Sequence, residues 1–301
     1  MLVEKMIYIL NFHKFCDIIK IDRRVMKNLN IIKPLLPVKS DFVFKLIFGD
    51  QRNVDILADF LKSVLDIPDE EYDRITIVDP HVKKESEKDK YGILDIKVHM
   101  SSGHVVHVEV QLWFIPEMKE RVLYYQSKMV TEQMSSGQDY SVIKKVVSII
   151  ITDYEIVPEN EKYHHKFRYR TEDGIEFTDL TEINTLELSK LPSATDSSEL
   201  WYWMKFIKSD DGEVFEMLAE RSPQMRKAVG VLKELSADER TRMLYEEREK
   251  ARRDVASMMG GADKSARVEI AKNLLKRKRP IKEIMEDTGL SRKEIESLKS
   301  E

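Results

Sequence analysis

The chain has 301 residues, which is long enough for one large domain or two modest ones. Apolar residues make up 42% of it and charged residues 35%, a composition that excludes disordered and fibrous classes. The net charge is -4, so no general positive field would hold this protein on nucleic acid.

The N-terminal stretch and the single cysteine bear on location. Cys16 has no partner for an intramolecular disulfide and cannot build a cysteine-rich zinc site, which fits a reducing cytoplasm. Residues 1–21 are apolar but short and interrupted by charges, and they lack a cleavage site, so we expect neither a membrane span nor a signal peptide. Met26 resembles a natural start, so residues 1–25 are expected to lie outside the functional fold as a misassigned start.

Two helices are predicted next. Residues 40–49 place Asp41, Phe44, Lys45 and Phe48 on one helical face; Ser40 is a candidate cap and Gly49 a stop. Residues 54–66 carry apolar side chains at helical spacing, and Pro68 closes this helix.

Strands alternate with one helix over the following eighty residues. Residues 75–82 are predicted as a strand, and 92–100 and 104–114 as a hairpin. An amphipathic helix over 117–134 precedes the β-branched run 146–152, which is typical of a strand buried on both faces. The order predicts a mixed α/β sheet with a helix crossing over between strands.

The remainder is expected to be mostly helical. A hairpin is predicted around Gly174, and a helix bears Trp201 and Trp203. Residues 260–298 suggest three short helices, with a basic cluster before Pro280, a turn at Gly289 and a cap at Ser291. This helix-turn-helix-like tail could contact phosphates through its basic cluster, or it could dock on the core or mediate homo-oligomerisation.

Acidic side chains line one face of the predicted hairpin. Because residues two apart in a strand share a face, Asp95 and Lys97 lie on one side of the first strand. Glu109 and Gln111 likewise share a side of the second, together with His107. A three-residue loop ending at a glycine would place Asp95 opposite Glu109, whereas a loop of two or four residues would put them on opposite faces.

Two carboxylates so placed repel each other unless a cation lies between them, which suggests a hard divalent ion such as Mg²⁺. The alternative is that both acids belong to an ordinary solvated hairpin face. A zinc site built on His99, His104 and His107 lacks a third neutral ligand at helical spacing.

The ordered series of motifs resembles the PD-(D/E)XK nuclease-family transposases, also called recombination-promoting nucleases. The resemblance runs from SDFVFKLIFG through GILDIKVHM and HVVHVEVQLWF, roughly residues 34–155, and includes the tail at 264–298. Matching positions are the two acids, the E-x-Q glutamine, and the R..YY helix with its exit: Asp95, Glu109, Gln111, Arg121, Tyr124, Tyr125, Gly137 and Tyr140.

This resemblance implies a restriction-endonuclease-like core, a mixed β-sheet flanked by helices with a helical C-terminal region. It implies a Mg²⁺-dependent DNA endonuclease, with Mn²⁺ as a substitute, that acts in mobile elements or DNA recombination. Asp95 and Glu109 would hold the metal, and the carbonyl of Val110 would add a ligand.

Gln111 departs from the lysine common in the superfamily, and an amide carries no charge. Lys97 on the neighbouring strand could supply that charge, or it could be an ordinary surface lysine; Lys45 is a further candidate. Arg121, Lys128 and Lys45 are the expected DNA-binding residues.

The expected organisation is an N-terminal extension over 1–33, a nuclease-like domain over 34–210 and a helical region over 211–301. DNA is the expected partner. Two alternatives are a noncatalytic nucleic-acid-binding module with the same fold, and an interaction protein that self-associates through its C-terminal helices.

Overall fold

The computed structural model describes residues 34–78 and 95–298. The predicted N-terminal extension and the last part of the strand predicted over 75–82 therefore lie outside the described residues.

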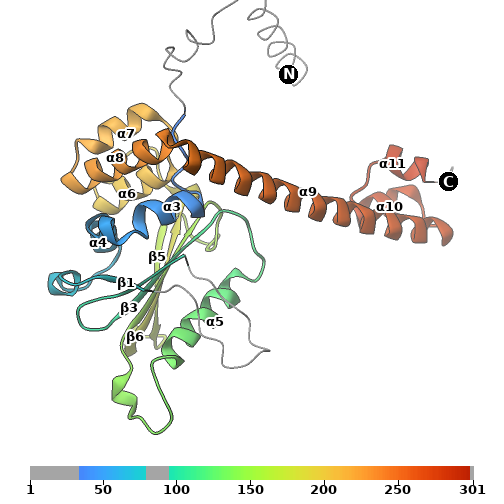
Figure 1. Cartoon of the computed structure of the whole chain (residues 1–301). Helices are drawn as coiled ribbons and strands as arrows, with labels where there is room; N and C mark the ends of the chain where they lie inside the picture. Colours follow the sequence, from blue (N-terminus) through green and yellow to red (C-terminus); the bar gives the residue numbers. More distant parts are fainter. Residues whose placement is uncertain (1–33, 79–94, 299–301) are drawn as a thin grey trace, which may run out of the picture. The chain divides into compact units, whose positions relative to one another are not determined.

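A mixed sheet forms the core (Figure 1). It has six strands in the order β1-β2-β3-β4-β6-β5. β1, β2 and β3 pair antiparallel, β3, β4 and β6 pair parallel, and β5 pairs antiparallel with β6. The strands are β1 (Thr76–Val78), β2 (Ile96–His99), β3 (Val105–Gln111), β4 (Val146–Thr152), β5 (His164–Arg170) and β6 (Glu176–Glu187). All seven residues of β4 are buried, which confirms the prediction of a strand covered on both faces.

The turn between β2 and β3 has the predicted geometry. Met100 N–H donates to the carbonyl of His104 at 2.9 Å, so three residues form the loop, and Gly103 has φ +88°. The ladder pairs Lys97 with His107 and Ile96 with Val108. Continued by one residue, this register sets Asp95 opposite Glu109, which is the predicted pairing.

The helix α5 (Met118–Thr131) connects β3 to β4 and covers one face of the sheet (Figure 1). Val105 of β3 packs with Tyr125 and Met129 of this helix, and Val122 packs with Ile150 of β4. The face of β3 that carries His107 and Glu109 therefore lies beneath α5 and is not a solvated surface.

The opposite face is covered by helices rich in aromatic residues: α3 (Asp41–Phe48), α4 (Val54–Val64) and α6 (Glu199–Lys208). Phe48 contacts the rings of Phe44, Phe60, Trp203 and Phe206, at centroid distances between 4.5 and 6.4 Å. This cluster fixes α3 in place, which matters because Lys45 extends from the same helix. Ser40 is the residue before α3, as predicted, but its side chain makes no capping hydrogen bond.

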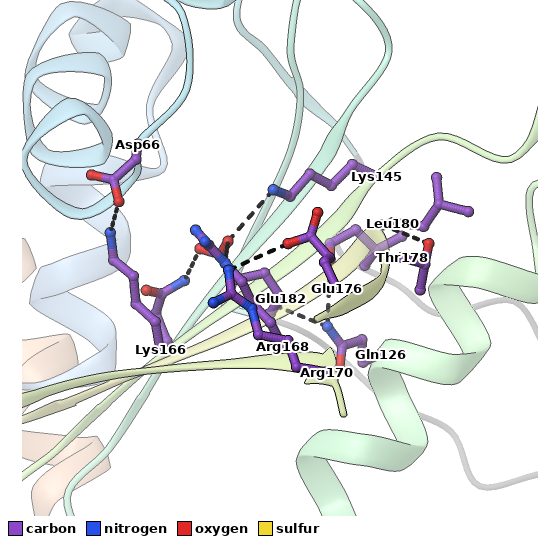
Figure 2. Close-up of polar contacts among 12 residues, drawn as sticks. Asp66, Gln126, Lys145, Lys166, Arg168, Arg170, Glu176, Thr178, Leu180 and Glu182 are labelled. Atoms are coloured by element: carbon purple, nitrogen blue, oxygen red, sulfur yellow. Dashed lines mark hydrogen bonds and ion pairs between the residues drawn. The ribbon is translucent and has the colours of Figure 1, made fainter. Parts of the chain in front are cut away.

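A buried charge network holds the edge strand β5 against β6 (Figure 2). The carboxylate of Glu182, on β6, accepts a hydrogen bond from Arg168 at 2.8 Å and pairs with Lys145 at 3.5 Å. Lys166, two residues earlier on β5, reaches Asp66 beyond the end of α4 at 2.5 Å. Lys166 and Arg168 of β5 are thus committed to structural contacts.

Further helices follow the sheet: α7 (Gly212–Ala219), α8 (Pro223–Ala237), α9 (Glu239–Lys276), α10 (Ile281–Thr288) and α11 (Arg292–Ser297). Short 3-10 turns are η1 (Gln51–Asn53), η2 (Asp69–Tyr72), η3 (Tyr140–Val142) and η4 (Leu188–Lys190). None of the helices described is long and apolar enough to cross a lipid bilayer.

The C-terminal tail differs from its prediction in one respect. Gly260 and Gly261 do not begin a new short helix; they lie inside α9, which runs unbroken for 38 residues. The turn at Gly289, with φ +67°, and the capping box at Ser291 are as predicted. The end of α9 packs with α10 and α11 around Ala271, Ile284 and Ile295.

Candidate active site

A cleft of about 390 Å³ opens where β3 ends, between α3, α5 and α9. Three carboxylates and three cationic side chains line it: Asp41, Asp95, Glu109, Lys45, Arg121 and Arg252. Gln111 and neighbouring residues of the chain after β3 complete the lining. Both predicted metal-binding acids therefore belong to one cleft.

Asp95 lies immediately before β2 and is tied to both neighbours. Its Oδ2 accepts the backbone N–H of Val110 at 2.7 Å, and its Oδ1 pairs with Nζ of Lys45 at 3.0 Å. Burial raises the pKa of the Asp95 carboxyl, although Lys45 and the Val110 N–H partly offset this effect. The backbone of β3 thus orients the Asp95 carboxylate, and Lys45 of α3 neutralises its charge.

Glu109 is 5% exposed on the α5 face of β3. Its Oε1 accepts a charge-assisted hydrogen bond from Arg121 of α5 at 3.0 Å. Burial raises the pKa of Glu109, Arg121 opposes the rise, and the negative charge of Asp95 adds to it. The charge of Asp95 therefore acts on Glu109, as expected for a carboxylate on a neighbouring strand.

His107 is buried beside Glu109, with Nε2 at 3.6 Å from the carboxylate Oε2. Burial lowers the pKa of His107 to about 3, so the imidazole is neutral at physiological pH. Neither ring nitrogen has a hydrogen-bond partner in the described part of the chain.

Gln111 ends β3 at the mouth of the cleft. Its Nε2 donates to the carbonyl of Trp113 at 3.0 Å. The neighbouring indole of Trp113 is 59% exposed. The Gln111 amide therefore lines the cleft, but its hydrogen bond to Trp113 ties it to the segment that follows β3.

Two cationic residues singled out from the sequence lie elsewhere. Lys97 shares the predicted face of β2, but its Nζ pairs with Glu132 at 3.1 Å, at the C-terminal end of α5. Lys128 lies almost two helical turns beyond Arg121 on α5. Neither is among the described residues that line the cleft.

The pair formed by Tyr124 and Tyr125 behaves as expected from helical geometry. Tyr125 is buried and receives the guanidinium of Arg121 over its ring, at 5.3 Å from the centroid, whereas Tyr124 is 38% exposed. Tyr125 thereby helps to orient the arginine that binds Glu109.

The family is decided by a comparison with family models. The model described as PD-(D/E)XK nuclease family transposase matches residues 38–262, more than half of the chain. The chain belongs to this family. Searches of curated proteins and of solved structures found no match.

The match extends from α3 through the sheet and into α9, so every residue that lines the cleft falls within the PD-(D/E)XK family region. The mixed sheet, the hairpin and the crossover helix agree with the nuclease fold expected from the sequence. The family assignment indicates a nuclease and an association with mobile elements.

Members of the wider PD-(D/E)XK group use divalent metals, and the donors of the cleft suit one. They are two largely buried carboxylates, and the negative charge of Asp95 raises the pKa of Glu109; hard oxygen donors of this kind suit Mg²⁺. Lys45 and Arg121 neutralise these acids in the structure. The donor set fits, although within the described residues no group of three or more metal-binding side chains occurs.

Arg252 is the charged residue of the described cleft lining that sequence reasoning missed. It lies on α9, pairs with Asp41 of α3, and comes from the region predicted to be a separate helical part. Its only sequence signal is a run of charged residues, which usually marks a solvated helical face.

Proposed function

We propose that this protein is a metal-dependent endonuclease that hydrolyses DNA phosphodiester bonds, in the cytoplasm and in the setting of mobile elements or DNA recombination. The observation that carries the proposal is the convergence of Asp95 and Glu109 in one cleft, with a cation beside each. The family assignment supports the nuclease part of this proposal.

Asp95 and Glu109 would hold Mg²⁺, or Mn²⁺ in its place, with the Val110 carbonyl as a further oxygen ligand. A divalent ion bound there would polarise the scissile phosphate and lower the pKa of a coordinated water. The N–H of Val110 fixes one oxygen of Asp95, so this acid is oriented before any ligand arrives.

The cations of the cleft would act on the substrate. Lys45 and Arg121 each hold a carboxylate in the structure, and each can turn to a phosphate oxygen when a metal takes over that carboxylate. Gln111 can orient a water or a phosphate through its amide, but it cannot supply positive charge. Lys45 is therefore our candidate for the charge that a lysine supplies in other PD-(D/E)XK enzymes.

Nicking of supercoiled plasmid in Mg²⁺ or Mn²⁺ tests the proposal. Asp95→Asn and Glu109→Gln keep the shape of each side chain but remove its charge, so each should lower nicking by at least about 100-fold. Glu120→Gln removes an exposed carboxylate one residue from Arg121 and serves as the matched control. If Asp95→Asn and Glu109→Gln nicked plasmid as fast as Glu120→Gln and the unaltered protein, this cleft would be excluded as the active site.

A noncatalytic nucleic-acid-binding module is the second candidate. Gln111 lacks the charge of the usual lysine, and both proposed metal ligands, Asp95 and Glu109, are already paired with protein cations. A salt-dependent affinity for DNA, unchanged by chelator and by Glu109→Gln, together with no nicking, would favour this alternative.

A further inference from the structure

Arg252 brings the C-terminal helix α9 into the cleft. Its guanidinium pairs with Oδ1 of Asp41 and with Oε1 of Glu249, the latter at 3.0 Å, and its side chain is 28% exposed. It therefore lines the cleft from a segment far from β2 and β3 in the sequence.

The first turn of α3 is held by two successive turns of α9. Arg248 lies over the ring of Phe42 at 4.5 Å from its centroid, and Arg252, four residues later, pairs with Asp41. Asp41 and Lys45 are themselves four residues apart, so they share one face of α3. Because Lys45 binds Asp95, this face is the one directed into the cleft.

The charges of the cleft balance pair by pair: Lys45 with Asp95, Arg121 with Glu109, and Arg252 with Asp41. Only the first two pairs involve the proposed metal ligands. The third contains neither proposed metal ligand, so a metal bound by Asp95 and Glu109 would leave Arg252 in the wall of the cleft, although the charge of Asp41 still acts on Asp95. A guanidinium has five N–H donors, and its contacts with Asp41 and Glu249 leave others for a phosphate.

We propose that Arg252 is a DNA-phosphate-binding residue of the cleft, and that Asp41 of α3 is the ion-pair partner with which a DNA phosphate competes for its guanidinium. This inference rests on the proposed function, because it assigns DNA to the same cleft. It makes α9 a part of the substrate-binding wall: a duplex that reaches Asp95 and Glu109 has a backbone phosphate against Arg252.

Binding of a fluorescent duplex oligonucleotide to the full chain, by anisotropy in Ca²⁺ and in EDTA over a range of salt, tests this without requiring cleavage. Arg252→Ala should weaken binding about tenfold and reduce the slope of log affinity against log salt by about one unit. Arg253→Ala removes the same charge from the exposed neighbouring residue and should change affinity less than about twofold. Arg252→Lys should lie between the two.

Asp41→Asn separates binding from architecture. If Arg252 binds phosphate, this variant keeps the guanidinium and should bind DNA at least as tightly as the unaltered protein. If Arg252 only fastens α9 to α3, then Arg252→Ala and Asp41→Asn should lower the melting temperature by similar amounts. Their DNA affinities should then be equal to each other. That result would overturn the inference, as would equal affinities of Arg252→Ala and Arg253→Ala.

The outcome for Arg252 is distinguishable from that for the nuclease. Loss of affinity in Arg252→Ala, with no nicking by the unaltered protein, would support the binding role and reject the enzyme. If the unaltered protein nicked DNA but Arg252→Ala changed neither the affinity nor the salt slope, the result would support the enzyme and reject the binding role of Arg252. Absence of duplex binding by the unaltered protein would reject both.

Discussion

Two lysines could supply the positive charge that Gln111 lacks, and the contacts of each distinguish them. Lys45 pairs with Asp95 at 3.0 Å, inside the cleft, whereas Lys97 pairs with Glu132 at 3.1 Å, where α5 ends. We expect Lys45→Ala to lower the rate of nicking about 100-fold to 1000-fold, as removal of one stabilising donor does elsewhere. Single-turnover rates at saturating protein measure this.

Lys97→Ala is the matched comparison, because it likewise removes a lysine that pairs with a carboxylate, in this case Glu132. It should lower the melting temperature but leave the single-turnover rate within about threefold of the unaltered protein. A larger rate loss in Lys97→Ala than in Lys45→Ala would reverse the assignment and restore the role predicted for Lys97 from strand alternation.

Glu182 gives a pH-dependent test of stability outside the cleft. Burial opposes ionisation of this carboxyl, but hydrogen bonding from Asn184 and the charges of Lys145 and Arg168 outweigh it, so the pKa is lowered. A carboxyl whose pKa is lower in the folded state stabilises the protein at pH values above its unfolded pKa. This stabilisation is lost as the pH falls through the folded pKa. Glu182→Gln should therefore cost about 3 kcal/mol at pH 7.

Thermal unfolding at pH 7 and near pH 3 measures this effect, and the difference between Glu182→Gln and the unaltered protein should narrow in acid. Glu176 pairs with Arg170 on the same strands, but both side chains are more than 40% exposed. Glu176→Gln should cost less than about 1 kcal/mol at either pH. A similar cost for both variants would show that the Glu182 network contributes no more than a surface pair.

The hairpin of β2 and β3 shows what a sequence can specify at the level of an element. Its register follows from a local signal, a three-residue loop that ends at Gly103, and from apolar side chains concentrated on one face. Asp95 and Glu109 could therefore be paired from sequence spacing alone. The face they occupy could not be recognised as buried, because α5 covers it and its packing depends on contacts between distant residues.

Gly103 itself is the testable part of this element. Its φ of +88° is unfavourable for a residue with a side chain, while an added Cβ would meet only Lys144 at 3.6 Å. Gly103→Ala should therefore cost about 1–2 kcal/mol through backbone strain and not through collision. The melting temperature should fall by several degrees, and nicking should persist because the register is kept.

Gly212→Ala is the control for this substitution, since Gly212 lies in the first turn of α7 without positive φ and with no atom within 4 Å of an added Cβ. It should leave stability unchanged or raise it slightly. If the two variants unfold at the same temperature, Gly103 is not required for the turn.

Glycine was misleading in α9. A Gly-Gly pair at 260 and 261 predicted a helix start, yet the helix continues through it. Each glycine costs about 1 kcal/mol relative to alanine, and good helix formers on both sides outweigh that penalty in a long helix. Local composition therefore identified helix but not its boundary.

At the scale of the whole molecule, the contacts that complete the core and the cleft join segments far apart in the chain. Trp203 of α6 donates from its indole to Asp59 of α4 at 3.1 Å, and Arg252 of α9 meets Asp41 of α3. No spacing or turn signal links such residues. The sequence predicted the elements and one strand register, whereas the partners of α6 and α9 required three-dimensional packing.

The predicted boundary at residue 210 falls between helices that pack together. Phe206 of α6 and Phe215 of α7 have no exposed surface and pack at 5.6 Å between ring centroids. Leu36 donates its backbone N–H to Ser236 of α8 at 2.9 Å. Helices after residue 210 thus complete the core that begins with α3, and we expect a chain that ends at residue 210 not to fold.

Loss of a buried phenylalanine alone costs about 3–5 kcal/mol, whereas a whole domain is stable by about 5–15 kcal/mol. A chain that ends at residue 210 loses Phe215 and the buried residues of α8, and its circular dichroism should show no cooperative unfolding. A chain that ends at residue 262 keeps Arg252 and should melt close to the full chain, because α10 and α11 pack on the end of α9 as a separate cluster. Cooperative unfolding of the shorter chain would show instead that the sheet and its first helices stand alone.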